Sequence, residues 1–397
     1  MADRRTQAEN RSINAMRTVA ALAVVVGHLR VLVFRQYHDV PHSLINFFLY
    51  GITSLGHQAV VVFFVLSGFW VGGSVLRKVQ RGAFSWPGYL NQRVTRLWVV
   101  LIPALVLTAV CDLIGRHLYG AQSTYQGVSA AAYGGVVTAQ QPIGPLAFVG
   151  NALFLQNVRV TPYGTNGPLW SLSYEFWFYM LFPLVVLAVT ARASRKAVLW
   201  WAIIAGVCLF IGMPLVSYFP MWCLGALVAA NQRWIALWLS DRKRLTVAFL
   251  RGGAGIVLVG MALGVRGLNS LEPTLGDYLV AVPATVFLAL LVTDVHPHGI
   301  LSKLLDVLSV SAHRSYSLYA IHLPLVLLLV SAIGIDVNSR WPPNIMHGLM
   351  FLVLLMVPLA AAWVFAAATE MRTAQARAWV SRIGAGAGRR MLTWSKK

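Results

Sequence analysis

Two polar side chains, an arginine and a histidine, bracket an apolar stretch near the start of the chain. Arg17 and His28 enclose "TVAALAVVVG", in which a threonine is the one polar residue. Eleven residues of α-helix make about three turns, so both side chains are expected on one helix face, roughly 16 Å apart. Small side chains at Ala20, Ala21 and Val24 share that face, which leaves room for something slender. Because ionisable groups inside apolar helices are costly, the pair favours a functional site.

A second cationic pair, Arg93 and Arg96 in "NQRVTRLW", stands just before another apolar run. Guanidinium groups on adjacent helical turns are well suited to binding phosphates. The alternative for this pair, and for Arg17, is anchoring of a helix end at a membrane surface. The alternative for His28 is capping of the outer end of its helix.

A carboxylate stands in the aromatic-rich segment "GPLWSLSYEFWFYMLFPL". Glu175 is identified as the one acidic residue within an apolar run, apart from Asp112 near the end of another. It can orient a histidine, accept a proton or bind a sugar hydroxyl, or it can be an acid favoured by a helix dipole. Ser171, Ser173 and Tyr179 are its polar neighbours and join it as candidate site residues.

Two further segments carry polar groups inside apolar runs. In "FFVLSGFW", Ser67 and Gly68 favour helix packing through small residues, and Ser67 is also kept as a candidate site residue. In "SYSLYAIHLPL", Tyr316 and His322 are candidate site residues. The alternative, about equally favoured, is a core position at which a neighbouring group satisfies the side chain's hydrogen bonds.

The elements that hold these residues are predicted to be membrane-spanning helices. The 397-residue chain is 58% hydrophobic and 11% charged, with a mean hydropathy of +0.68. Its apolar runs are long and do not alternate, which indicates an all-α membrane protein and disfavours a β-barrel. Three cysteines show no metal-ligand spacing, so no metal site is predicted. About ten spans are expected, at 13–34, 51–76, 97–113, 168–190, 198–213, 214–230, 245–265, 278–293, 315–334 and 346–368.

The net charge of +20 reflects clusters of basic residues between apolar runs, which disfavours nucleic-acid binding. With ten spans, 26 of the 32 Lys and Arg residues fall on the side of the N-terminus, and this bias predicts that both termini are cytoplasmic. Residues 1–370 are expected to form one membrane domain, and 371–397 a disordered basic tail near anionic lipid. Within 114–167, "PLAFVGNALFLQN" is too short to span and is interpreted as a re-entrant or interfacial segment.

Five patches, in this order, resemble the acyltransferase 3 family of bacterial membrane proteins, which O-acylate glycans and other acceptors. They are "RTVAALAVVVGH", "FFVLSGFW", "QRVTRLWVVLIP", "NGPLWSLSYEFWFYMLFP" and "SYSLYAIHLPL". The family's Arg–ten residues–His, Arg-x-x-Arg and Ser-Leu-Ser-x-Glu elements are matched here. One departure is Asn14-Ala15, where the family commonly has Asp-Gly.

The resemblance implies an acyl-coenzyme A co-substrate, most commonly acetyl-coenzyme A, that is reached from the cytoplasm, with no tightly bound cofactor. It implies His28 and Glu175 as catalytic residues and Arg17, Arg93 and Arg96 as donor-binding residues. The expected acceptor is a glycan or glycolipid, and the expected location is the bacterial cytoplasmic membrane. The acceptor's identity and the oligomeric state stay open. A transporter or flippase, and a scaffold in glycan assembly, are the alternative functions; inverted repeats typical of many carriers are not visible.

Overall fold

The computed structural model describes residues 10–120, 125, 141–191, 194–267, 272–293 and 299–382, and within these ranges it contains helices but no β-strand. Nine helical segments of this described part are long and apolar enough to cross a membrane, and α10, with 17 residues, falls just short of that length. Each of the ten expected spans coincides with a helix, which confirms an all-α, multi-pass membrane protein. The helices are α2 (Arg11–Val33), α3 (Leu44–Ile52), α4 (Gly56–Ser67), η3 (Gly68–Gly72), α5 (Gly73–Gln80), α6 (Trp86–Tyr119), α8 (Pro145–Ala152), η5 (Gly167–Leu169), α9 (Trp170–Thr190), α10 (Arg195–Ile211), α11 (Met213–Val216), α12 (Phe219–Ala230), α13 (Gln232–Ser240), α14 (Arg244–Gly267), α15 (Pro273–Leu290), α16 (Ile300–Ser311), α17 (Ser315–Ala332) and α18 (Ile345–Ala368).

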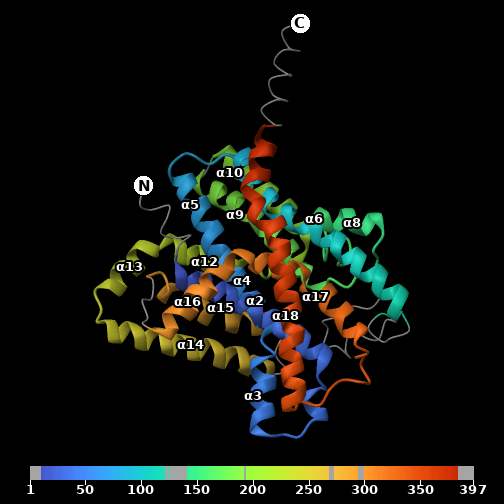
Figure 1. Cartoon of the computed structure of the whole chain (residues 1–397). Coiled ribbons are helices and arrows are strands. Elements are labelled where there is room, and N and C mark those ends of the chain that lie inside the picture. Colours follow the sequence, from blue (N-terminus) through green and yellow to red (C-terminus); the bar gives the residue numbers. More distant parts are fainter. Residues whose placement is uncertain are drawn as a thin grey trace.

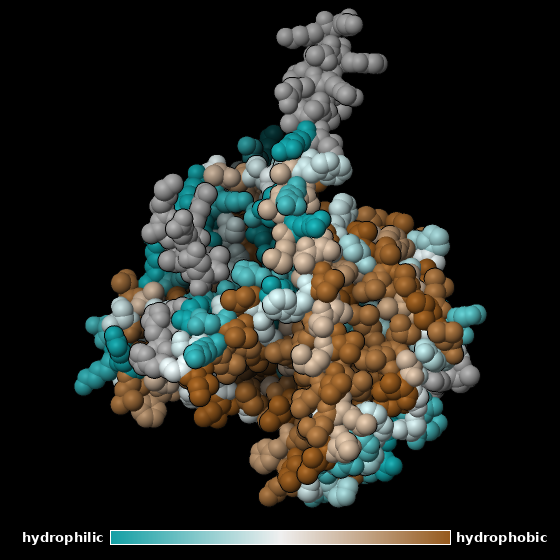
Figure 2. Space-filling view, in the orientation of Figure 1, coloured by the Kyte–Doolittle hydropathy of each residue, from teal (hydrophilic) through white to brown (hydrophobic). Residues whose placement is uncertain are grey.

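Helix α2 lies inside the bundle and packs against α4, α16, α17 and α18 (Figure 1). Its first turns lie beside the end of α18, where Arg17 pairs with Glu370, and its last residues lie beside the start of α18, where Phe34 bridges to Trp341. We call these the inner and outer ends of the bundle. Figure 2 shows apolar side chains covering the middle of one face, with hydrophilic ones toward both ends, as a bilayer requires.

Three segments differ in detail from the sequence-based expectation. Helix α6 begins at Trp86, well before the expected run, so Arg93 and Arg96 lie within the helix rather than ahead of it. The fifth and sixth expected spans are separated at Gly212, whose φ of 81° suits glycine alone. Residues 371–382, the part of the expected disordered tail that the structure describes, are helical (3-10 at 371–372 and α at 373–382), and 383–397 lie outside the described residues.

The short apolar piece predicted as re-entrant forms α8, which packs along α6. The Arg116 side chain donates to the Gln141 carbonyl near the C-terminal end of α6, and the Trp98 indole donates to the Ala152 carbonyl much earlier in the same helix. The 18 residues between these contacts correspond to about 27 Å of helix. The chain therefore descends far along α6 and returns, as a re-entrant segment does.

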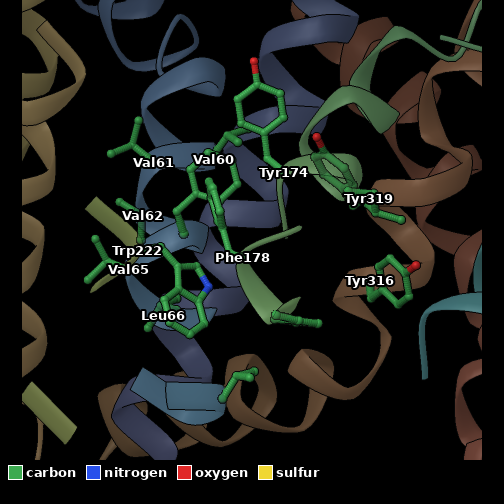
Figure 3. Packing of buried hydrophobic residues seen from close by; sticks show 14 of the residues in the cluster. Val60, Val61, Val62, Val65, Leu66, Tyr174, Phe178, Trp222, Tyr316 and Tyr319 are labelled. Carbon is green, nitrogen blue, oxygen red and sulfur yellow. The ribbon is translucent and has the colours of Figure 1, made fainter. Parts of the chain in front are cut away.

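Two glycines bring α12 against the junction of α4 and η3. A Cβ on Gly68 would lie 1.8 Å from the Trp222 carbonyl oxygen, and a Cβ on Gly225 would lie 1.8 Å from that of Val65. The helices thus touch backbone to backbone, as small residues permit in membranes. This confirms the packing interpretation of Gly68. Figure 3 shows Val60, Trp222 and other apolar side chains of the resulting core.

Candidate functional site

Two cavities lie one above the other along α2. The inner cavity has a volume of about 90 Å³, and the outer cavity about 440 Å³, which is within the usual range for small-molecule sites. Val60 and Tyr319 line both, so these two side chains form the partition between them. The polar residues of the inner cavity are Arg17, Ser67, Arg96, Ser171, Glu175, Tyr179, Ser315 and Tyr316; those of the outer cavity include His28, Arg30, Gln36, Thr53, Ser54, His57, Asn157 and Arg266.

His28, in the outer cavity, forms a pair with the second predicted histidine. Its Nδ1 lies 2.8 Å from Nε2 of His322, and the two rings are stacked with centroids 5.0 Å apart. His322 is completely buried, and its Nδ1 lies 2.7 Å from the Tyr319 carbonyl oxygen. His28 therefore faces the interior of the bundle and not lipid.

These contacts fix the tautomer of both rings when they are neutral. A carbonyl oxygen only accepts, so Nδ1 of His322 must carry the proton and donate to Tyr319. The Nε2 of His322 then has a lone pair, which accepts a hydrogen bond from the Nδ1–H of His28. The remaining nitrogen of His28, Nε2, is left with a free lone pair, as a general base requires.

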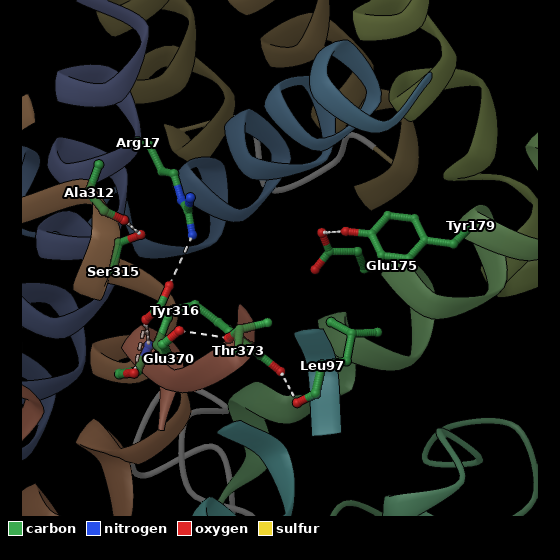
Figure 4. Close-up of polar contacts among 10 residues, drawn as sticks. Arg17, Leu97, Glu175, Tyr179, Ala312, Ser315, Tyr316, Glu370 and Thr373 are labelled. Carbon is green, nitrogen blue, oxygen red and sulfur yellow. Dashed lines mark hydrogen bonds and ion pairs between the residues drawn. The ribbon is translucent and has the colours of Figure 1, made fainter. Parts of the chain in front are cut away.

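Arg17 enters the inner cavity from α2. Its guanidinium lies 3.7 Å from the carboxylate of Glu370 and over the ring of Trp70, 5.8 Å from the ring centroid (Figure 4). Glu370 is held in place because it accepts hydrogen bonds from both the backbone and the hydroxyl of Ser317, at 3.0 and 2.9 Å. Glu370 is a site residue that the sequence pattern does not indicate, because it follows the last expected span.

Glu175 faces Arg17 from the other side of the inner cavity (Figure 4). Its Oε1 accepts hydrogen bonds from the hydroxyls of Tyr179 and, at 2.8 Å, Ser67. The indole of Trp222 donates in turn to Ser67 at 3.1 Å. Among the described residues, Glu175 has no hydrogen bond to a histidine, so it belongs with the inner cationic groups.

The two arginines of the Arg-x-x-Arg pattern have different surroundings. Arg96 lines the inner cavity. Arg93 does not line it: its side chain is 5% exposed and lies against the rings of Tyr89 and Tyr179, 5.6 and 5.7 Å from their centroids. Only Arg96 of this pair therefore reaches a ligand in the inner cavity directly, and Arg93 supports the wall behind it.

The remaining candidates are mostly held by hydrogen bonds within the bundle. The Ser171 hydroxyl lies 2.7 Å from the hydroxyl of Tyr319, a residue that was not predicted and that donates to the Pro168 carbonyl at 2.5 Å. The Ser173 hydroxyl donates to a backbone carbonyl, that of Phe154, at 2.7 Å. Tyr316, seen with Tyr319 in Figure 3, donates to the Leu97 carbonyl at 3.1 Å while lining the inner cavity. Ser173 alone of this group lines neither cavity.

The path between Arg17 and His28 differs from the predicted one. Ala20 and Ala21 are buried and line neither cavity, and Val24 reaches the outer cavity only. Neighbouring helices form the cavity walls instead, because the small side chains of α2 pack directly against those helices. The walls between the two polar groups are Val60 and Phe63 of α4 and Tyr319 of α17.

A second histidine of the outer cavity was not predicted. His57 donates through Nε2 to both oxygens of Asp277, at 2.9 Å, and Tyr218 donates to the same carboxylate at 2.7 Å. Asp277 is 2% exposed and lies in the first turns of α15, so Glu175 and Asp112 are not the only acids of the spanning helices. The sequence does carry one indication of this residue, because Asp277 directly precedes the expected span 278–293.

Comparisons with known proteins identify the family of the chain. The profile of the acyltransferase 3 family, described as an acyltransferase domain, matches residues 10–369. The chain is 28% identical to acyltransferase MdmB of Streptomyces mycarofaciens over 300 residues, which cover 71% of this chain and 69% of that protein. No solved structure matches significantly.

Proposed function

This chain belongs to the acyltransferase 3 family and is a multi-pass membrane acyltransferase, and from that premise we propose that it transfers an acyl group from cytoplasmic acyl-coenzyme A to a glycan hydroxyl. Acetyl is the acyl group we expect, and the bacterial cytoplasmic membrane is the expected location. The observation that carries the proposal is the series of two cavities, with cationic side chains in the inner one and a histidine with a free nitrogen in the outer one.

The inner cavity suits the donor. Arg17 and Arg96 provide guanidinium groups that bind phosphates, and Trp70 and Tyr316 provide apolar walls for the pantetheine arm. Glu175 keeps Ser67 and Tyr179 in fixed positions, so we assign it a positioning role in this cavity. The thioester passes the partition of Val60 and Tyr319 to reach His28.

The outer cavity suits a sugar acceptor because polar side chains line it together with Trp170, and sugars commonly pack on such aromatic rings. His28 Nε2 takes the proton of the acceptor hydroxyl as its oxygen attacks the thioester carbonyl carbon. The carbon–sulfur bond breaks, the ester forms, and the coenzyme A thiolate leaves and takes up the proton. No metal or tightly bound cofactor is needed for this sequence of steps.

The test is acyl transfer by purified protein in liposomes, with radiolabelled acetyl-coenzyme A and envelope glycan from the source membranes. His28→Ala is expected to lower kcat on the order of 10²-fold or more, as the loss of a general base does. Arg96→Ala is expected to raise the donor KM with a smaller change in kcat. Full activity of His28→Ala would disprove the catalytic role, and absence of any acetyl-coenzyme A turnover by the unsubstituted protein would favour a transporter.

A further inference from the structure

Two arginines line the outer cavity together with His28. Arg30 lies in the last turn of α2 and Arg266 in the last turn of α14. They are two of only six basic residues that the sequence places on the outer side, where cations are rare. Their position beside the catalytic histidine is therefore not explained by membrane anchoring.

The guanidinium groups of both residues keep hydrogen-bonding capacity. Arg30 lies over the Tyr50 ring, 5.3 Å from its centroid, and its buried Nε has no hydrogen-bond partner. Arg266 donates one hydrogen bond, to the Ser54 carbonyl at 2.6 Å. Each guanidinium has five donors in a planar fork, so most of them are available to a ligand.

Neither arginine has a carboxylate partner within the part of the chain that the structure describes. Asp277, the acid next to the cavity residue His57, is already held by His57 and Tyr218. Arg30 and Arg266 carry like charges and line the same cavity. Arg30 is half-buried and Arg266 is exposed. A half-buried cation that shares a cavity with a like charge and has no counterion is costly, and a bound oxyanion would compensate it.

We propose that Arg30 and Arg266 bind an oxyanion of the acceptor, a phosphate or a carboxylate, while a hydroxyl of the same molecule reaches His28. This inference rests on the proposed function and deepens it, because it assigns the acceptor to the class of anionic glycans. The phosphates of the donor are not the ligand in question, since the groups suited to them, Arg17 and Arg96, lie in the inner cavity.

The test is ligand binding to the purified protein, measured as a shift in melting temperature, with glucose 1-phosphate, glucuronate and uncharged methyl glucoside. Both anions, or one of them, are expected to raise the melting temperature, and methyl glucoside is not. Arg30→Gln and Arg266→Gln are each expected to weaken the binding of the anion about tenfold or more. The anion with the larger effect distinguishes a phosphate acceptor from a carboxylate acceptor.

Two control variants locate the site. Arg159→Gln removes an outer-side arginine that lies on the Phe210 ring, away from the cavity, and Arg96→Gln removes the inner site. Anion binding is expected to persist in both. Equal binding of anionic and neutral sugars, loss in Arg96→Gln, or retention in Arg266→Gln would overturn the inference. His28→Ala separates the two proposals, because it should abolish transfer and leave anion binding intact.

Discussion

At the scale of single residues, the group that orients the catalytic candidate is a second imidazole and not a carboxylate. In the common arrangement an acid holds the histidine and stabilises its positive charge. Here His322 fills that place, and the Tyr319 carbonyl fixes its proton. A neutral partner fixes the tautomer of His28 without lending it negative charge. The arrangement suits a base that gives its proton up again quickly.

Replacement of His322 tests this positioning role. His322→Ala removes the acceptor for the His28 Nδ1–H, so the ring can rotate or change tautomer, and kcat is expected to fall on the order of 10²-fold. His322→Gln retains an acceptor oxygen and is expected to restore part of the activity. Steady-state kinetics should show the loss in kcat with an unchanged donor KM. A raised donor KM with normal kcat would place His322 in donor binding.

At the scale of elements, the positions of the helices can be predicted from the sequence, but the contacts between helices cannot. Apolar runs predict spans because a hydrocarbon core requires about 20 apolar residues per helix. His28 and His322 are separated by 294 positions, and His57 and Asp277 by 220, so no local spacing encodes either pair. Helices α2, α4, α9 and α17 each contribute residues to both cavities, and these contributions depend on how the helices cross. The sequence therefore indicates His28 as a candidate site residue, but it does not indicate that His28 meets His322 or that Arg30 and Arg266 line the same cavity.

The crossing of α12 with the α4–η3 junction gives a prediction for stability. Gly68→Ala and Gly225→Ala would each place a methyl group against a backbone carbonyl, so the helices must separate. The expected cost is at least about 1–3 kcal/mol, as for overpacked cores. Because Ser67 and Trp222 lie at this crossing, the inner cavity would lose its shape as well.

The measurement is thermal unfolding in detergent alongside membrane yield. Gly206→Ala is the matched control, since a Cβ there meets no atom within 4 Å and Gly206 also lies inside an apolar helix. A melting temperature for Gly68→Ala equal to that of Gly206→Ala would contradict the prediction, because it would show that α12 can move away from the α4–η3 junction with no loss of stability.

At the scale of the whole molecule, the two cavities form a series from one end of the bundle to the other. The cationic inner cavity lies at the end where Arg17 meets Glu370, and the outer one lies where α2 ends. Val60 and Tyr319 separate the two cavities. Under the proposed function, the acyl group would pass this partition while the bulky nucleotide of the donor stays behind. Donor and acceptor would then never share one aqueous compartment.

This arrangement predicts that acyl transfer has a fixed sidedness. Inverted membrane vesicles, with the cytoplasmic face outward, are expected to use added acetyl-coenzyme A, and right-side-out vesicles only after permeabilisation. The reason is that the basic clusters, which are enriched on the N-terminal side, predict a cytoplasmic position for Arg17 and Arg96. Radiolabel should appear in acceptor inside the inverted vesicles, protected from added esterase. Equal rates from both vesicle types, with vesicle integrity verified, would mean that donor reaches His28 from the outer cavity.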